Sequence, residues 1–133
     1  MQELNATSPA ALPPALGMQA SSSIDRSALD AIRALQSDED PNIVRELITI
    51  YLEDSIGRLA EMRTTVSNGD PTLTRRAAHG LKGSSANLGA HILADLCAQL
   101  EDTPDSFLAS ELLSRIEIEF QSVKAALELE SRR

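Results

Sequence analysis

The chain has 133 residues, which suits a single domain, and 42% of them are hydrophobic although it has no Trp, one Tyr and two Phe. Its formal net charge of −8 and its few aromatic side chains argue against nucleic-acid binding, which needs a basic surface and stacking platforms. No run of about 20 apolar residues predicts a membrane span, no secretory signal is recognisable, and the single Cys97 cannot form an intramolecular disulfide.

The N-terminal segment differs in composition from everything after it. The stretch TSPAALPPALGMQASSS is rich in Pro, Ala and Ser, is nearly uncharged and has no sustained periodicity. We therefore expect residues 1–23 to be a flexible linker or tail and residues 24–130 to form the folded domain. Such a leader favours an origin within a larger protein, with a free-standing domain as the alternative.

The first two predicted helices follow this segment. A short helix is expected after the cap candidate Asp25, with its apolar residues at Ala28, Leu29, Ile32 and Leu35. Asp40 is the cap candidate for a long second helix, and Pro41 stands at its first position, where a missing N–H costs nothing. The apolar stripe of this helix is interrupted only by Ser55 and comprises Ile43, Val44, Leu47, Ile48, Tyr51, Leu52, Ile56, Leu59, Met62 and Val66.

Three further helices complete the pattern. Asn68-Gly69 ends the second helix, Asp70 caps the third, Pro71 begins it, and Leu88-Gly89 ends it. The fourth helix has an inward stripe of Leu93, Leu96, Cys97 and Leu100. After the turn residues DTP, the last helix carries Leu108, Leu112, Ile116, Phe120, Val123 and Leu127. Because long amphipathic helices with short loops pack most simply as a bundle, we expect an all-α fold: an antiparallel four-helix bundle with a short extra N-terminal helix.

The segment HGLKGSSANLGA, residues 79–90, contains the candidate site. On a helical wheel centred on Leu81, His79 falls on the side away from the apolar stripe, and so do Gly83 and Ala86. An exposed glycine inside a helix costs about 1 kcal/mol relative to alanine. That cost is explained if a bulky partner has to approach His79, because glycine removes the side chain that would block it.

Basic residues surround this histidine in an otherwise acidic chain. Lys82 lies three residues after His79 on the helix, and Arg75 and Arg76 add positive charge one turn earlier. A neutral imidazole is a good nucleophile near neutral pH, and a neighbouring lysine would neutralise charge on an incoming phosphoryl group. These residues therefore indicate an imidazole that is transiently phosphorylated by a protein partner.

Two other chemistries fit the segment less well. A metal site is disfavoured because His91 lies beyond the Gly89 break and a cation would sit among like charges. A Ser-His hydrolase is disfavoured because Ser84 and Ser85 lie on the inward half of the wheel and no nucleophile elbow is present. We therefore predict no metal ligands.

The run AAHGLKGSSANLGAHILADLCAQLE, residues 77–101, resembles histidine-containing phosphotransfer (HPt) domains of multistep phosphorelays, and the resemblance extends over about residues 25–129. It implies that His79 accepts a phosphoryl group at Nε2 from an aspartyl phosphate of one receiver domain and passes it to an aspartate of another. It also implies that Lys82 steadies the phosphoryl oxygens and that Gly83 leaves room for the receiver. Glu101 stands where family members often have a Gln or Glu that bonds the other imidazole nitrogen. We count Arg75, Arg76 and Ala86 with the partner-binding residues.

The same resemblance sets the expected cofactors, partners and location. The domain would need no nucleotide or cofactor, since Mg²⁺ would come with the receiver, and it would have no autokinase activity. Donor and acceptor receiver domains of response regulators are the expected partners, with no nucleic acid and no direct membrane contact, and the isolated domain is expected to be a monomer. We expect a cytoplasmic domain, in particular the C-terminal module of a bacterial hybrid sensor histidine kinase, through which it could be tethered to the inner membrane.

Two alternatives belong to other functional classes. The dimerisation helices of a sensor histidine kinase typically carry an acidic residue directly after the histidine, whereas Gly80 follows here and no chain remains for an ATP-binding domain. The second alternative is a non-catalytic helical adaptor bundle whose basic patch docks a signalling partner without chemistry. Phosphoryl transfer from a phosphorylated receiver separates the adaptor from the phosphocarrier.

Overall fold

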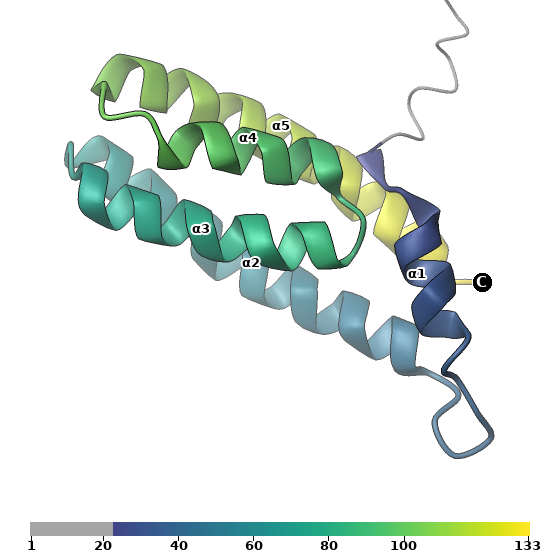
Figure 1. Cartoon of the computed structure of the whole chain (residues 1–133). Helices are drawn as coiled ribbons and strands as arrows, with labels where there is room; N and C mark the ends of the chain where they lie inside the picture. The colour runs from purple at the N-terminus through teal and green to yellow at the C-terminus, as the bar shows by residue number, and fades with distance from the viewer. Residues whose placement is uncertain (1–22) are drawn as a thin grey trace, which may run out of the picture.

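A computed structural model describes residues 23–133, and the elements within them are helices (Figure 1). In chain order they are α1 (Arg26–Arg33), α2 (Ile43–Ser67), α3 (Pro71–Asn87), α4 (His91–Glu101) and α5 (Ser106–Ser131). The four longer helices pack around one core, in which α2 contacts α3, α3 contacts α4, α4 contacts α5, and α5 returns to α2. The fold is the predicted antiparallel four-helix bundle, and α1 lies across one end of it. Most of the predicted linker, residues 1–22, falls outside the described residues.

Aspartate side chains cap three of the helices. Asp25 accepts a hydrogen bond from the backbone N–H of Ser27 at 3.0 Å, and Asp70 accepts one from Leu73 at 3.0 Å. Both caps were predicted, as was the proline at the start of α3. Asp105 caps α5 in the same way. Each cap satisfies backbone donors that have no partner within the helix.

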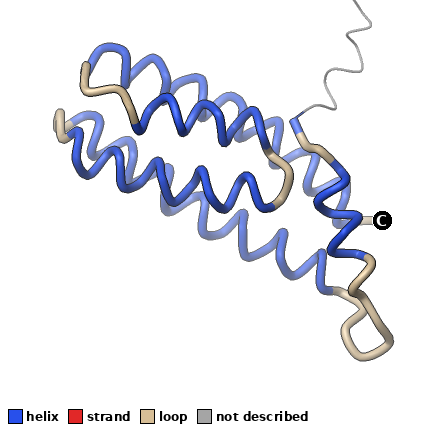
Figure 2. The backbone as a smooth tube through the Cα atoms, in the orientation of Figure 1, coloured by secondary structure: helices blue, strands red, loops and turns tan. Residues whose placement is uncertain are grey.

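The predicted start of α2 is wrong by two residues. Asp40 does not cap this helix, because its backbone N–H bonds to Ser37 within the loop that joins α1 to α2 (Figure 2). The helix starts at Ile43, and its N-cap Asn42 makes no side-chain capping bond. The side-chain oxygen of Gln36 accepts from the N–H of Val44 at 3.2 Å instead. Gln36, which lies outside the helix, therefore provides the capping oxygen that was predicted for Asp40.

The core agrees with the predicted stripes except near their edges. Cys97 is fully buried, as expected for a structural thiol, and burial raises its pKa to about 12. Four residues predicted to face inward are exposed instead: Leu35, Leu47, Ile56 and Leu108. Leu35 lies beyond α1, and Leu108 lies in the first turn of α5, where the bundle offers no further layer to cover it. Leu47 and Ile56 show that the buried seam of α2 is narrower than a 3,4-spaced stripe suggests.

The short helix α1 is fixed at both of its ends. At the first end, the N–H of Asp25 donates to the carbonyl of Gly89 at 2.8 Å, in the turn between α3 and α4. At the other end, Arg33 forms an ion pair with the buried carboxylate of Glu130 at 2.7 Å. These contacts join α1 to the turn between α3 and α4 and to the end of α5. None of the helices between residues 23 and 133 is long and apolar enough to cross a membrane.

We predict that Gly89→Ala destabilises the domain more than Gly69→Ala does. Both glycines have a positive φ, 85° and 67°, which costs any other residue about 1–2 kcal/mol. A Cβ on Gly89 would also lie 2.3 Å from the backbone oxygen of Asp25, whereas a Cβ on Gly69 would meet only Ser106 Oγ at 3.8 Å. We expect losses of about 3 kcal/mol and about 1 kcal/mol, measured by urea unfolding followed by circular dichroism. Equal losses would contradict the docking of α1 on this turn.

Candidate functional site

His79 projects from the middle of α3 into solvent. Its side chain is 70% exposed, whereas Ala77, Ala78 and Leu81 on the same helix are buried in the core. The orientation follows from the helical repeat, because a residue two positions from Leu81 lies on the far side of the helix. The imidazole is therefore accessible, as the wheel predicts.

Glu101, the last residue of α4, contacts this imidazole. Its Oε2 lies 2.9 Å from Nδ1 of His79, and its side chain is only 14% exposed. An ionised carboxylate has no proton to donate, so Nδ1 must be the donor in this hydrogen bond. The neutral ring then carries its proton on Nδ1, and the lone pair of Nε2 remains available. Glu101 thus occupies the position that the resemblance assigns to it.

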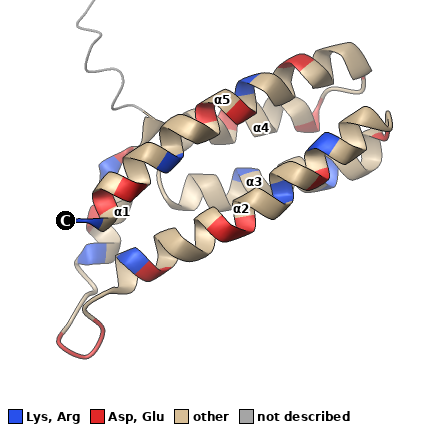
Figure 3. Cartoon of the chain, turned by 180° about the vertical axis from the view of Figure 1, so that it is seen from behind, with Lys and Arg blue, Asp and Glu red and all other residues tan. Residues whose placement is uncertain are grey.

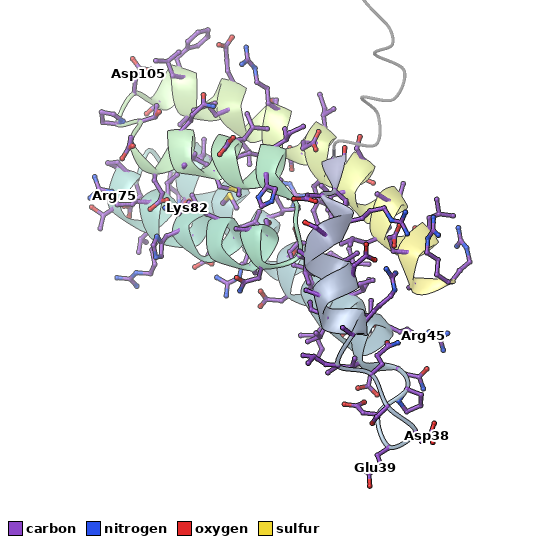
Figure 4. The ribbon with its side chains drawn as sticks, turned by 45° about the vertical axis from the view of Figure 1, so that its right-hand side comes forward. Asp38, Glu39, Arg45, Arg75, Lys82 and Asp105 are labelled. Carbon is purple, nitrogen blue, oxygen red and sulfur yellow. The ribbon has the colours of Figure 1, made fainter. Side chains whose placement is uncertain are left out.

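Lys82 contacts the same carboxylate on its other oxygen. The distance from Lys82 Nζ to Glu101 Oε1 is 2.5 Å, so each carboxylate oxygen has its own partner on α3. The position of Lys82 on the same helix as His79 predicted a lysine beside the imidazole but not this ion pair with Glu101. Lys82 and Arg75 lie along the same side of the bundle, far from Arg45 at its other end (Figure 4).

Lys82 and His79 stabilise the ionised form of Glu101. Partial burial by itself raises the pKa of the carboxyl, but the hydrogen bonds and charges of Lys82 and His79 outweigh burial and leave the pKa below its ordinary value of 4.5. Glu101 is consequently ionised at neutral pH. It can hold the imidazole in one tautomer and offset positive charge that develops on the ring.

The remaining predicted residues lie around the imidazole at different depths. A Cβ built on Gly83 would meet nothing within 4 Å, so this part of α3 is open to an approaching molecule. The Nε of Arg75 donates to the backbone carbonyl of Glu101 at 3.3 Å, which ties α3 to the end of α4. Arg76 and Ala86 are exposed. A shallow cavity of about 310 Å³ is lined by Thr72, Arg75, Arg76, His79 and Glu101.

The serines that follow are engaged elsewhere. Ser84 Oγ donates to the backbone carbonyls of Gly80 and Leu81, and Ser85 is buried with its Oγ 2.8 Å from the hydroxyl of Tyr51. Neither hydroxyl is placed to be activated by His79. His91 begins α4 whereas Glu101 ends it, so the two histidines are separated by the length of that helix. Residues 23–133 hold no cluster of His, Cys, Asp and Glu suited to a metal ion.

One further cation near His79, Arg58, was not predicted from the sequence. Arg58 comes from α2, and its guanidinium lies against Gly80, the residue that directly follows His79. No local sequence signal links Arg58 to Gly80, because the contact depends on how α2 and α3 pack. Gly80 itself is the sequence feature that could have indicated this contact. Its role, which is to leave room for the Arg58 guanidinium, depends on how α2 and α3 pack.

The chain is similar to known proteins in both sequence and structure. The Hpt domain family matches residues 46–127. Sensor protein TorS of Escherichia coli (strain K12) is 34% identical over 82 residues, which are 62% of this chain and 9% of TorS. Histidine-containing phosphotransfer protein 2 of Arabidopsis thaliana is 26% identical over 103 residues, which cover 73% of this chain and 66% of that protein. The chain thus spans a small part of the first relative and about two thirds of the second.

A solved structure of a histidine-containing phosphotransfer protein is similar as well. The crystal structure of histidine-containing phosphotransfer protein B from Pseudomonas aeruginosa PAO1 is similar with a TM-score of 0.73 and 31% sequence identity. The similarity covers 84% of this chain and 96% of that one. It therefore extends over nearly the whole of the neighbouring structure and not over a shared fragment.

We predict that the carboxyl carbon of Glu101 titrates below pH 4.5 and that Lys82→Ala raises its midpoint, because the ammonium is the strongest of the groups that hold the carboxylate charged. Since the folded pKa is the lower one, the stability gained from this ionisation is present near neutral pH and is lost as pH falls through the folded pKa. The measurement is ¹³C NMR titration of the side-chain carboxyl. Lys124→Ala, on α5, is the control and should leave the midpoint unchanged. A wild-type midpoint at or above 4.5 would contradict the arrangement.

Proposed function

The chain belongs to the Hpt domain family, and we propose that His79 is the residue on which it carries phosphoryl groups. Domains of this family are phosphorelay intermediates of two-component signalling, and they are phosphocarriers without kinase activity of their own. The observation that supports His79 is its imidazole, which is 70% exposed and is bonded to Glu101 through Nδ1, so that the lone pair of Nε2 is available.

The transfer step follows from that arrangement. The lone pair of Nε2 attacks the phosphorus of an aspartyl phosphate on a receiver domain, an N–P bond forms, and the P–O bond to the aspartyl carboxylate breaks. The carboxylate leaves with the electron pair, and positive charge develops on the imidazole. Glu101 offsets that charge through the Nδ1–H hydrogen bond. The reverse step, with a second receiver aspartate as acceptor, releases the imidazole again.

Lys82 supports the phosphoryl group in this proposal. An ammonium has three donors, so Lys82 can keep its bond to Glu101 and direct another N–H toward a phosphoryl oxygen. Glu101 then positions the imidazole and the ammonium together. The Mg²⁺ that receiver domains use would be held by the receiver, and the chemistry on this chain is carried by His79, Lys82 and Glu101.

The surface around His79 suits a receiver domain as partner. Gly83 leaves an open approach along α3, and Arg75 and Arg76 place positive charge next to the acceptor ring. Receiver active sites are acidic, so this local patch would attract them even though the chain as a whole carries a charge of −8. In Figure 3, Asp and Glu residues are spread along the helices and also occupy the loop between α1 and α2. Ala86 extends the open face.

The wider context is also a proposal. Similarity to 9% of sensor protein TorS supports the origin of this domain as a module of a hybrid sensor kinase, where it would work as a monomeric unit on the cytoplasmic side. A non-catalytic adaptor bundle is the competing function. It would use the basic patch for docking and would have no need for a hydrogen-bonded imidazole with a free Nε2.

We predict that the wild-type domain acquires an acid-labile, alkali-stable phosphate from a phosphorylated receiver domain and that His79→Gln acquires none. His91→Gln is the matched control, because His91 is also exposed but lies at the other end of α4. This variant should be labelled like the wild type. Labelling is measured with ³²P on gels treated separately with acid and alkali. Wild-type labelling of His79→Gln would rule out the site.

We further predict that Lys82→Ala slows phosphoryl transfer about 10- to 100-fold, because the ammonium no longer offsets charge on the phosphoryl oxygens. The bundle should remain folded, because Lys82 lies at the surface and contributes no buried apolar contact. Rapid-quench experiments with a phosphorylated receiver give the rate of phosphoryl transfer, and thermal unfolding gives the Tm. An unchanged rate, or a large fall in Tm, would instead assign Lys82 a structural role.

A further inference from the structure

The guanidinium of Arg58 fills the space left by the missing side chain of Gly80. A Cβ built on Gly80 would lie 1.8 Å from Nη1 of Arg58 and 2.7 Å from its Cζ. No side chain could occupy position 80 while Arg58 keeps this conformation. Gly80 follows His79 directly, so α2 holds a cation against the backbone of α3 next to the acceptor histidine.

A carboxylate on the same helix fixes the direction of this side chain. Nε of Arg58 donates to Oδ2 of Asp54 at 2.6 Å, one turn earlier on α2. The side chain is 35% exposed. Among residues 23–133, the structure records no hydrogen bond from its terminal Nη1 and Nη2 groups. The guanidinium is thus held at its Nε edge while its other edge keeps free donors.

Arg58 lies on a different side of α3 from Lys82 and Arg75, two other cations near His79. Lys82 is bonded to the side chain of Glu101, and Arg75 is bonded to the backbone of Glu101, on the side of α3 that faces α4. Arg58 lies on the side that faces α2. His79 therefore has cations on both flanks of α3, and Arg58 is the one that lies against the backbone of the residue next to it.

We propose that Arg58, seated on Gly80, is a specificity-determining residue that binds a carboxylate on the receiver domain docked over His79. A planar guanidinium with two free terminal amino groups matches a carboxylate in a bidentate manner, which a flexible ammonium cannot do. Gly80 contributes by leaving room for the guanidinium close to the backbone of α3. This inference rests on the proposed function, since it concerns the partner of the same site.

The test is the rate of phosphoryl transfer as a function of receiver concentration. The probe is the phosphorylated receiver domain that transfers fastest to the wild type in a panel of purified receivers. We expect Arg58→Ala to raise the KM for this receiver about three- to tenfold, with little change in kcat and a weaker dependence on salt. Arg58→Lys should recover only part of the loss, because it keeps the charge but not the planar fork.

Gly80→Ala tests whether receiver binding depends on the position of the Arg58 guanidinium against Gly80 as well as on its charge. The methyl group would displace the guanidinium, whose far end is flexible, so the helix should stay folded while KM rises as in Arg58→Ala. In the Arg58→Ala background, Gly80→Ala should have no further effect on KM. Additive effects of the two substitutions would overturn the proposed link between them.

Arg63→Ala is the matched control. Arg63 is also an ion-paired arginine on α2, but it pairs with Glu117 of α5, on a different side of the bundle. Its removal should leave the KM unchanged. If the wild type receives no phosphoryl group from any receiver, the proposed function fails together with this inference. If transfer occurs and Arg58→Ala has the wild-type KM, only the inference fails, and Arg58 serves merely to join α2 to α3.

Discussion

The carboxylate of Glu101 connects the parts of this site to one another. One of its oxygens accepts from Nδ1 of His79 and the other contacts Nζ of Lys82, so an imidazole and an ammonium on α3 are positioned by one residue at the end of α4. Three charged or polar groups at a surface would normally be mobile and only weakly coupled. Here the carboxylate is mostly buried and is held in its ionised form by the two groups it positions.

The bundle is what makes this contact possible. His79 can reach Glu101 only if α3 and α4 lie side by side with the end of one next to the middle of the other. The turn at Gly89 reverses the chain between them, and the contact of Asp25 with that turn attaches α1 to the same place. The buried faces of α3 and α4 bring the two helices together without burying His79 or Gly83, which remain exposed. Stability and function thus use different faces of α3.

Local signals in the sequence predicted much of this, and long-range contacts account for what was missed. Asp25 and Asp70 were correctly identified as caps because a cap depends on the next three residues. Asp40 was misassigned because Ser37 holds it in the loop and Gln36 provides the capping oxygen. The orientation of His79 followed from helical periodicity alone. The pairing of Lys82 with Glu101 and the seating of Arg58 on Gly80 each join two helices, and no spacing within one helix reveals them.

The central claim is that Nε2 of His79 accepts the phosphoryl group while Nδ1 keeps its proton and its bond to Glu101. It is tested most directly by NMR of the ¹⁵N-labelled domain after phosphorylation by a receiver. We expect ³¹P–¹⁵N coupling to Nε2 of His79 and a protonated Nδ1 in the same ring. Coupling to Nδ1, or a phosphoryl group on any other residue, would contradict it.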